Sequence, residues 1–159
     1  MEDIKNMTTH DFTKQAKVGN VVKIESKTYT IKEVVLWKLL RSGGSYHKYT
    51  LIDQKGDDKY RFAEDPESGR FILVRIFDLK NKSPFLPSYT VNNKKFEFTY
   101  GEVCIAQKVS RGAEHKKGSS DIWCDYENPD GSYMSLGTIF PSGTKEDLIG
   151  CCQNALHYY

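Results

Sequence analysis

The sequence predicts an all-β protein built from two duplicated β-meander or small barrel-like units that share one core and end in a short C-terminal α-helix. Apolar and polar residues alternate with a period of two through the middle of the chain, as in half-buried strands. The stretch "KIESKTYTI" (23–31) also has a relative in "TVNNKKFEF" (90–98). With 159 residues, the chain is long enough for a single compact domain spanning 1–159.

The first unit opens with a hairpin and continues through further strands. The direction changes at Glu25–Lys27, between two strands that share an apolar face formed by Val22, Ile24, Tyr29 and Ile31. The apolar run "VVLWKLL" (34–40) follows, and then two arms flanking the turn "QKGD" predict a second hairpin. The run "FILVRIFDL" (71–79) is apolar on both faces, which indicates a central strand.

The second half repeats this layout after the proline-containing break "KNKSPFLPS". The step from Val91 to Phe96 matches the step from Ile24 to Tyr29 at an offset of 67 residues, whereas Gly131 matches Gly56 at an offset of 75. An insertion of about eight residues therefore separates the two matches, and we assign it to the basic loop "KVSRGAEHKKG" (108–118). These matches predict internal repeats over about 18–80 and 86–141.

The end of the chain, "TKEDLIGCCQNALHYY", predicts a helix over about 145–157. Thr144 and Asp147 have the spacing of a capping box. Leu148, Cys152 and Tyr159 recur at helical intervals, although Gly150 weakens a helix by about 1 kcal/mol.

Composition argues for a soluble, cytoplasmic chain. The net charge is +2, no apolar run approaches the ~20 residues of a membrane-spanning helix, and the acidic start has no apolar core typical of a signal peptide. We therefore expect no membrane insertion. The four cysteines are Cys104, Cys124, Cys151 and Cys152. Because the last two are adjacent and poorly spaced for pairing, we expect reduced thiols.

The sequence contains no catalytic, cofactor or metal motif. Counted from Asp125, the acidic stretch "DYENPDGSY" fails the EF-hand pattern, and the cysteines and histidines lack zinc-ligand spacing. We therefore predict no cofactor, metal or catalytic residue. One enzymatic alternative stays open, in which folding brings Cys124 next to His47 or His115.

Large amphipathic rings favour a binding module instead, with another protein or a peptide as partner. The rings belong to Trp37, Tyr46, Tyr49, Trp123, Tyr126 and Tyr133. The predicted surface combines Trp123 and Tyr126 with the basic insertion, represented by Arg111, Lys116 and Lys117, since long loops on a rigid sheet tend to carry function. Binding of single-stranded nucleic acid or of a small ligand remains an alternative, as does a merely solvated loop with Trp123 in the core.

Several of these residues also carry a family resemblance. The matching positions are Gly19, Asn20, Val22, Tyr29, Ile31, Tyr49, Leu51 and Gly56, followed in the second half by Phe96, Phe98, Gly101, Tyr126 and Gly131. Over residues 18–140 this pattern resembles the bacterial family named domain of unknown function 4178. The resemblance implies a bacterial, cytoplasmic, all-β protein and brings no activity. The chain departs from the family at His47–Lys48, where members tend to carry Trp.

Overall fold

A computed structural model describes residues 12, 16–64, 71–79 and 86–153, and over these residues the protein is all-β, as predicted. The described strands form one ten-stranded antiparallel sheet. They are β1 (Val21–Ile24), β2 (Lys27–Leu39), β3 (Ser45–Asp53), β4 (Tyr60–Glu64), β5 (Phe71–Ile76), β6 (Ser88–Val91), β7 (Lys94–Val109), β8 (Ser120–Glu127), β9 (Ser132–Phe140) and β10 (Thr144–Gln153).

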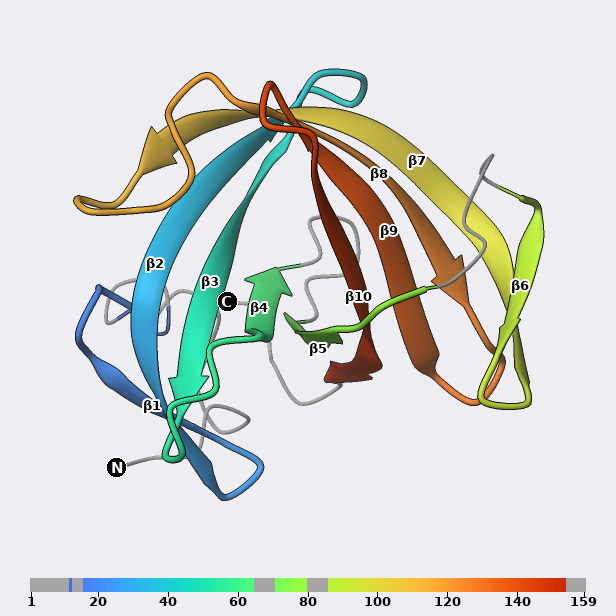
Figure 1. Cartoon of the computed structure of the whole chain (residues 1–159), viewed down its shortest axis with the longest axis horizontal. Coiled ribbons are helices and arrows are strands. Elements are labelled where there is room, and N and C mark those ends of the chain that lie inside the picture. The colour runs from blue at the N-terminus through green and yellow to red at the C-terminus, as the bar shows by residue number, and fades with distance from the viewer. Residues whose placement is uncertain (1–11, 13–15, 65–70, 80–85, 154–159) are drawn as a thin grey trace.

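The sheet closes on itself. Its strand order is β1-β2-β3-β4-β5-β10-β9-β8-β7-β6, and β2 pairs in addition with β7. The eight strands that run from β2 to β7 in this order therefore form a ring, which the β2–β7 pairing closes. The remaining strands, β1 and β6, are the two ends of the sheet, and they pair with β2 and β7 respectively. In Figure 1 the long strands converge at the top and spread apart below, with the short strands β4 and β5 between β3 and β10.

The two halves of the chain, β1–β5 and β6–β10, follow the same path. Each opens with a tight hairpin, closed by the pair Ile24↔Lys27 in one half and by Val91↔Lys94 in the other. The two turn residues have positive φ angles in both hairpins, 49° and 65° at Glu25 and Ser26 and 51° and 62° at Asn92 and Asn93. This is the type I′ geometry that suits the twist of two-residue hairpins.

A β-bulge lies at the same place in both halves. The register shifts between Ile31 and Glu33 in β2, and between Phe98 and Tyr100 in β7, again 67 positions later. Because a bulge adds one residue to one strand, it reverses the alternation of side chains on the two faces of that strand. Ile31 therefore lies on the outer face of the ring, whereas Glu33 points to the inside.

Two seams join the halves, and each contains a pair of equivalent positions. In the seam between β2 and β7 Lys38 faces Ile105, its counterpart 67 positions later. In the seam between β5 and β10 Arg75 faces Ile149, 74 positions later. An approximate twofold axis therefore passes through both seams. The internal repeats over about 18–80 and 86–141 stay a prediction, and the second half of the sheet continues beyond residue 141 with β10.

The outer face carries one apolar cluster in each half. The first contains Tyr29, Ile31, Tyr49, Leu51 and Phe62, packed under Phe12 and Ala16. The second contains Phe96, Tyr126, Met134 and Leu136, packed with Tyr89, Phe77 and Leu79. Each cluster is thus covered in part by the segment that precedes the first hairpin of its half, and this cover protects apolar surface that a solvated sheet face would expose.

The inside of the ring is partly polar. Lys48 on β3 reaches Glu146 on β10, and since these strands are not neighbours, the contact crosses the ring. Apolar residues of the inside include Val35, Trp37, Leu39, Tyr46 and Cys104. Buried polar side chains include Glu33, Thr50, Glu102, Asp121, Ser135 and Glu146. Buried carboxylates of this kind need partners, and those partners define the site described below.

The predicted helix over 145–157 is wrong as far as Gln153, because β10 occupies this stretch and pairs with both β9 and β5. Gly150 shows the physical reason. A Cβ atom at this position would lie 2.3 Å from the carbonyl oxygen of Leu73, so the glycine allows two backbones to approach closely within the sheet. A short helix would forgo both ladders of hydrogen bonds. Residues 154–157 lie outside the described part of the chain.

Candidate functional site

The two aromatic residues of the predicted binding surface lie on opposite faces of β8. Tyr126 is fully buried on the outer face, where its hydroxyl donates a hydrogen bond of 2.8 Å to the carbonyl oxygen of Leu86. Trp123 is half-buried and points to the inside, where its Nε1 donates to Sγ of Cys104 at 3.1 Å. An odd spacing along a strand gives opposite orientations, so the structure does not bring these two rings together.

Arg111, Lys116 and Lys117 are exposed on the β7–β8 loop. This loop, drawn in orange on the left of Figure 1, lies against β2. Hydrogen bonds fix its start there, since the amide of Ser110 donates to the carbonyl of Val34 at 2.9 Å and the amide of Val34 donates to Oγ of Ser110 at 3.1 Å. The basic side chains are therefore displayed from an anchored loop.

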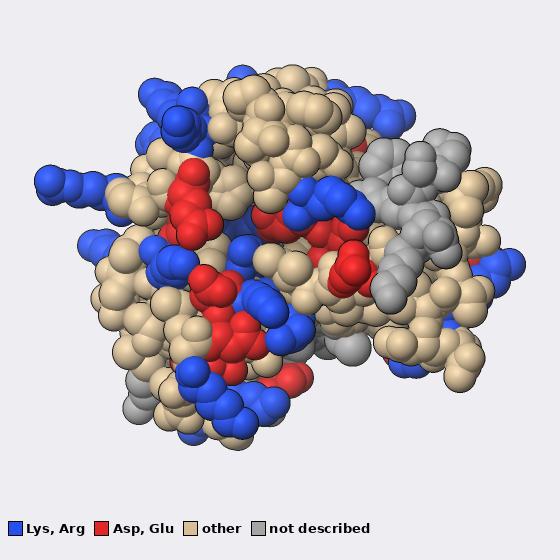
Figure 2. All heavy atoms as spheres, in the orientation of Figure 1, with Lys and Arg blue, Asp and Glu red and all other residues tan. Residues whose placement is uncertain are grey.

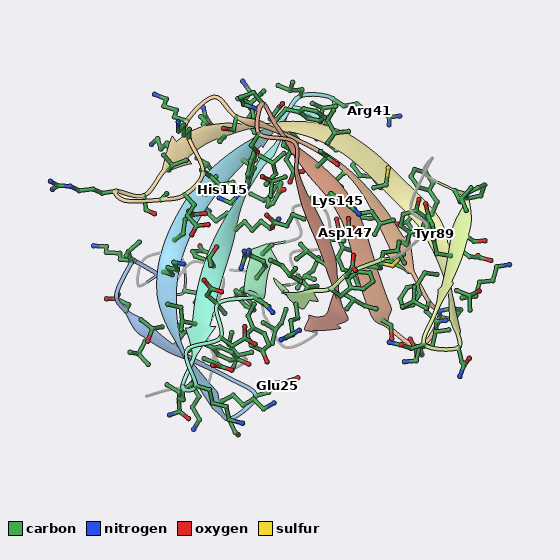
Figure 3. All side chains as sticks on the ribbon, viewed as in Figure 1. Glu25, Arg41, Tyr89, His115, Lys145 and Asp147 are labelled. Atoms are coloured by element: carbon green, nitrogen blue, oxygen red, sulfur yellow. The ribbon has the colours of Figure 1, made fainter. Side chains whose placement is uncertain are left out.

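His115 of the same loop is turned inward. In Figure 3 it lies between the loop and β2. Its Nδ1 is 2.5 Å from Oε1 of Glu33, and its Nε2 is 3.7 Å from Oε2 of Glu146. The backbone amide of Glu114 donates to the second oxygen of Glu33 at 2.6 Å. The imidazole also contacts the ring of Trp37 edge to face, with 5.7 Å between the ring centroids.

Two strand-borne cations complete this buried charge network. Nζ of Lys48 lies 2.6 Å from Oε1 of Glu146, and Nε of Arg61 lies 3.5 Å from the same oxygen. Asp121 is buried on β8 and adds negative charge near Lys48. Figure 2 shows acidic and basic side chains side by side across the middle of the face of the molecule that is turned to the viewer. We call the set Glu33, Lys48, Arg61, His115, Asp121 and Glu146 the inner charge network.

Electrostatic interactions keep Glu33, His115 and Glu146 ionised. Hydrogen bonding to the carboxylates of Glu146 and Glu33 raises the pKa of His115 to about 9, so the imidazole is a cation at neutral pH. Burial alone would raise the pKa of Glu146, but the nearby Lys48 and His115 lower it overall. Burial also works against ionisation of Glu33, and His115 again lowers the pKa of this carboxyl overall. A protonated imidazole fastened between carboxylates is a poor general base.

The cysteine chemistry left open by the sequence finds no support in the geometry. Burial raises the pKa of Cys104 to about 12, which leaves a protonated, unreactive thiol. Cys124 packs on the outer face with the second apolar cluster, whereas His115 points inside the ring. His47 stacks against Tyr49 in the other half of the chain. Neither Cys104 nor Cys124 is in a disulfide bond among the described residues.

An open groove lies beside β6 on the outer side of the ring. Its volume is about 620 Å³, and its lining residues are Leu86, Pro87, Ser88, Lys95, Glu97, Phe98 and Tyr126. Phe98 is 49% exposed, whereas its counterpart in the first half, Ile31, is only 1% exposed. The second half therefore leaves open an apolar position that the first half covers. The sequence analysis singled out Tyr126 in this groove as a binding residue but not Phe98.

Within the described residues, no group of His, Cys, Asp and Glu side chains is arranged to hold a metal ion. No helix in this part of the chain is long and apolar enough to cross a membrane. Comparisons of the chain with protein families, curated proteins and solved structures find no match. The resemblance to domain of unknown function 4178, with the bacterial source and cytoplasmic location that it implies, therefore stays a prediction.

Proposed function

We propose that the chain is a non-enzymatic binding module that holds an extended, apolar segment of a partner protein in the groove beside β6. The observation that carries this proposal is the exposure of Phe98. A phenylalanine that is half accessible on the wall of a groove offers apolar area that a partner removes from water. Leu86, at 43% exposure, lies on the same groove.

The edge of β6 supports an extended occupant. Among the described strands, β6 stands last in the sheet order and pairs only with β7. The amide of Phe98 donates to the carbonyl of Pro87 at 2.9 Å, and in an antiparallel ladder the hydrogen-bonded positions then alternate. The backbone groups of Ser88 and Thr90 consequently point away from β7. A peptide strand added along this edge receives hydrogen bonds from them while its side chains enter the groove.

The groove offers no strong excess of either charge. Lys95 and Glu97 lie 3.5 Å apart across its rim and are both well exposed. A partner is therefore recognised by an apolar side chain packed between Phe98 and Leu86 and by backbone pairing, more than by ionic contacts. This composition favours a peptide over a nucleic acid, whose phosphates need clustered cations.

Selection of displayed peptides against the intact protein tests the proposal, followed by affinity measurements on the selected sequences. We expect Phe98→Ala to weaken binding by about tenfold or more, because the anchor contact is lost. Phe140→Ala is the matched control, since Phe140 is 42% exposed but does not line the groove. Equal losses for both variants, or peptides that ignore Phe98, would contradict the proposed site. Oligonucleotide binding that persists in Phe98→Ala would instead support the nucleic-acid alternative.

A further inference from the structure

The inner charge network has a mixed origin. Glu33, Lys48, Arg61, Asp121 and Glu146 all stand on strands of the ring. His115 alone among the six comes from a loop, and this loop is the insertion that distinguishes the second half from the first. The corresponding β2–β3 connection is only Leu40–Gly44. The ring thus supplies a fixed charged site, and the insertion supplies one cation to it.

Charge counting shows what the site requires. The strand-borne members comprise three carboxylates, on Glu33, Asp121 and Glu146, and two cations, on Lys48 and Arg61. Without His115 these five strand-borne groups would hold one uncompensated negative charge at a largely buried position. Such a charge is costly unless a cation joins it. Glu33 is the carboxylate most dependent on the loop, because both of its oxygens accept from residues 114 and 115.

Trp37 adds an aromatic ring and a buried N–H group to the site. Trp37 is 1% exposed and lies edge to face with the His115 ring. Its indole Nε1 is buried and has no hydrogen-bond partner among the residues that the structure describes. A buried donor of this kind loses free energy unless an acceptor reaches it. Two carboxylates beside an indole ring suit an organic cation, and the free N–H suits a hydrogen-bond acceptor on the same molecule.

We propose that the inside of the ring is a binding site for a small organic cation, of the amine, guanidinium or imidazolium class, and that His115 occupies this site as an internal substitute until the ligand displaces it. The ligand's cationic group replaces the imidazole between Glu33 and Glu146. An acceptor on the ligand pairs with Nε1 of Trp37. Displacement releases the β7–β8 loop, which carries Arg111, Lys116 and Lys117 on its exposed side.

Imidazole and methylguanidinium are the probes. In the full-length wild-type protein we expect either cation to bind saturably and to shift the NMR signals of the His115 ring toward those of a solvated histidine. In His115→Gly the internal competitor is gone, so imidazole should bind about tenfold more tightly than to the wild type. Adding Glu33→Gln to His115→Gly should abolish this binding. His47→Gly is the matched control and should gain no imidazole site.

These measurements distinguish a cation-binding site from a fixed structural histidine and from an anion site. If imidazole fills only the truncated variant and no cation moves His115 in the wild type, His115 is a fixed structural residue and the proposal is wrong. If His115→Gly does not fold, the wild-type NMR titration decides alone. Tighter binding of phosphate than of either cation would also overturn the proposal, because it would assign the site to Lys48 and Arg61 as an anion site. Peptide binding at Phe98 is measured separately, so either proposal can fail without the other.

Discussion

Exposure separates His115 from the basic residues around it. The lysines and the arginine of the insertion remain in water, whereas the imidazole crosses to two buried carboxylates. The sequence did not reveal this, because a histidine in a basic loop has no periodic pattern that indicates burial. A weaker signal existed in Glu33, which interrupts the apolar alternation of its strand. A carboxylate at an inward position needs a partner, and the sequence alone does not identify it.

The pH dependence of stability follows from His115. Its pKa is about 9 in the folded protein against 6.5 ordinarily, so its contribution is fully present below pH 6.5 and is lost as pH rises through 9. This shift corresponds to a loss of about 3 kcal/mol in unfolding free energy. The lowered pKa values of Glu33 and Glu146 act in the opposite direction and remove stability below about pH 4.5.

Urea unfolding at a series of pH values checks this expectation. Maximum stability should fall between about pH 4.5 and 6.5, between the ordinary pKa values of glutamate and histidine. The charged groups facing His115 are Glu33 on β2 and Glu146 on β10, and Glu146 also contacts Lys48 on β3 and Arg61 on β4. His115→Gln should remove the decline between pH 6.5 and 9. A decline that persists in this variant would assign the effect to another group.

Gly150 provides a second prediction at the scale of one residue. Gly150→Ala should lower the free energy of unfolding by about 3 kcal/mol, since the new methyl group meets the backbone of Leu73 and Val74 rather than a flexible side chain. Gly44→Ala is the control, because the nearest atoms to a Cβ there are a side-chain methyl at 3.5 Å and a hydroxyl at 4.0 Å. Chemical denaturation of both variants measures the difference. Similar losses at the two sites would contradict the close approach at β5.

At the scale of the element, hairpins were the most predictable feature. The turns at Glu25–Lys27 and around Lys94 follow directly from alternation and are present. Within the run over 71–79, the strand β5 covers Phe71–Ile76 and lies between two strands as expected, whereas residues 77–79 are outside it. The bulges and β10 were missed. A bulge adds one residue without a distinctive composition, and Leu148 and Cys152 fit helical spacing as well as strand alternation.

The first hairpin turn is not optimal for its geometry. Glu25 and Ser26 adopt positive φ angles, which Asn and Gly adopt at lower cost. Replacing Glu25–Ser26 by Asn–Gly should raise the free energy of unfolding by about 1 kcal/mol. The control is Asn92→Asp in the equivalent turn, which we expect to change stability by less than about 0.5 kcal/mol. A thermal unfolding series on both variants suffices, and a loss of stability in the Asn–Gly variant would argue against the type I′ turn.

At the scale of the whole molecule, closure of the ring could not be predicted from the sequence. The repeat pattern gives the path within each half, but the seams pair strands that are far apart along the chain, and no local signal specifies them. The internal duplication stays a prediction, supported by matching turns, bulges and seam registers. The prediction that Trp123 and Tyr126 share one surface suffered from the same lack of information. Only the closed ring shows that Trp123 lies on its inside and Tyr126 on its outer face.

Because both seams are continuous ladders, the two halves should unfold together. Trp37 stands on β2 in the first half and Trp123 on β8 in the second, and both pack in the apolar cluster inside the ring. In the variants Trp37→Phe and Trp123→Phe, fluorescence of the remaining tryptophan and the β-sheet circular dichroism signal should give coincident denaturation curves. The midpoints of the two variants differ only by the stability that each substitution removes. Separate fluorescence and circular dichroism transitions within one variant would show that the halves are independent.

The two seam pairs Lys38–Ile105 and Arg75–Ile149 also bear on how identical halves of separate chains avoid pairing with each other. Lys38 and Arg75 occupy the axial positions of the first half, and each faces an isoleucine of the second. If two first halves from different chains paired along the same registers, lysine would face lysine and arginine would face arginine, and directly opposed like charges destabilise a sheet. The axial charges therefore penalise pairing of two first halves and favour pairing of each first half with a second half.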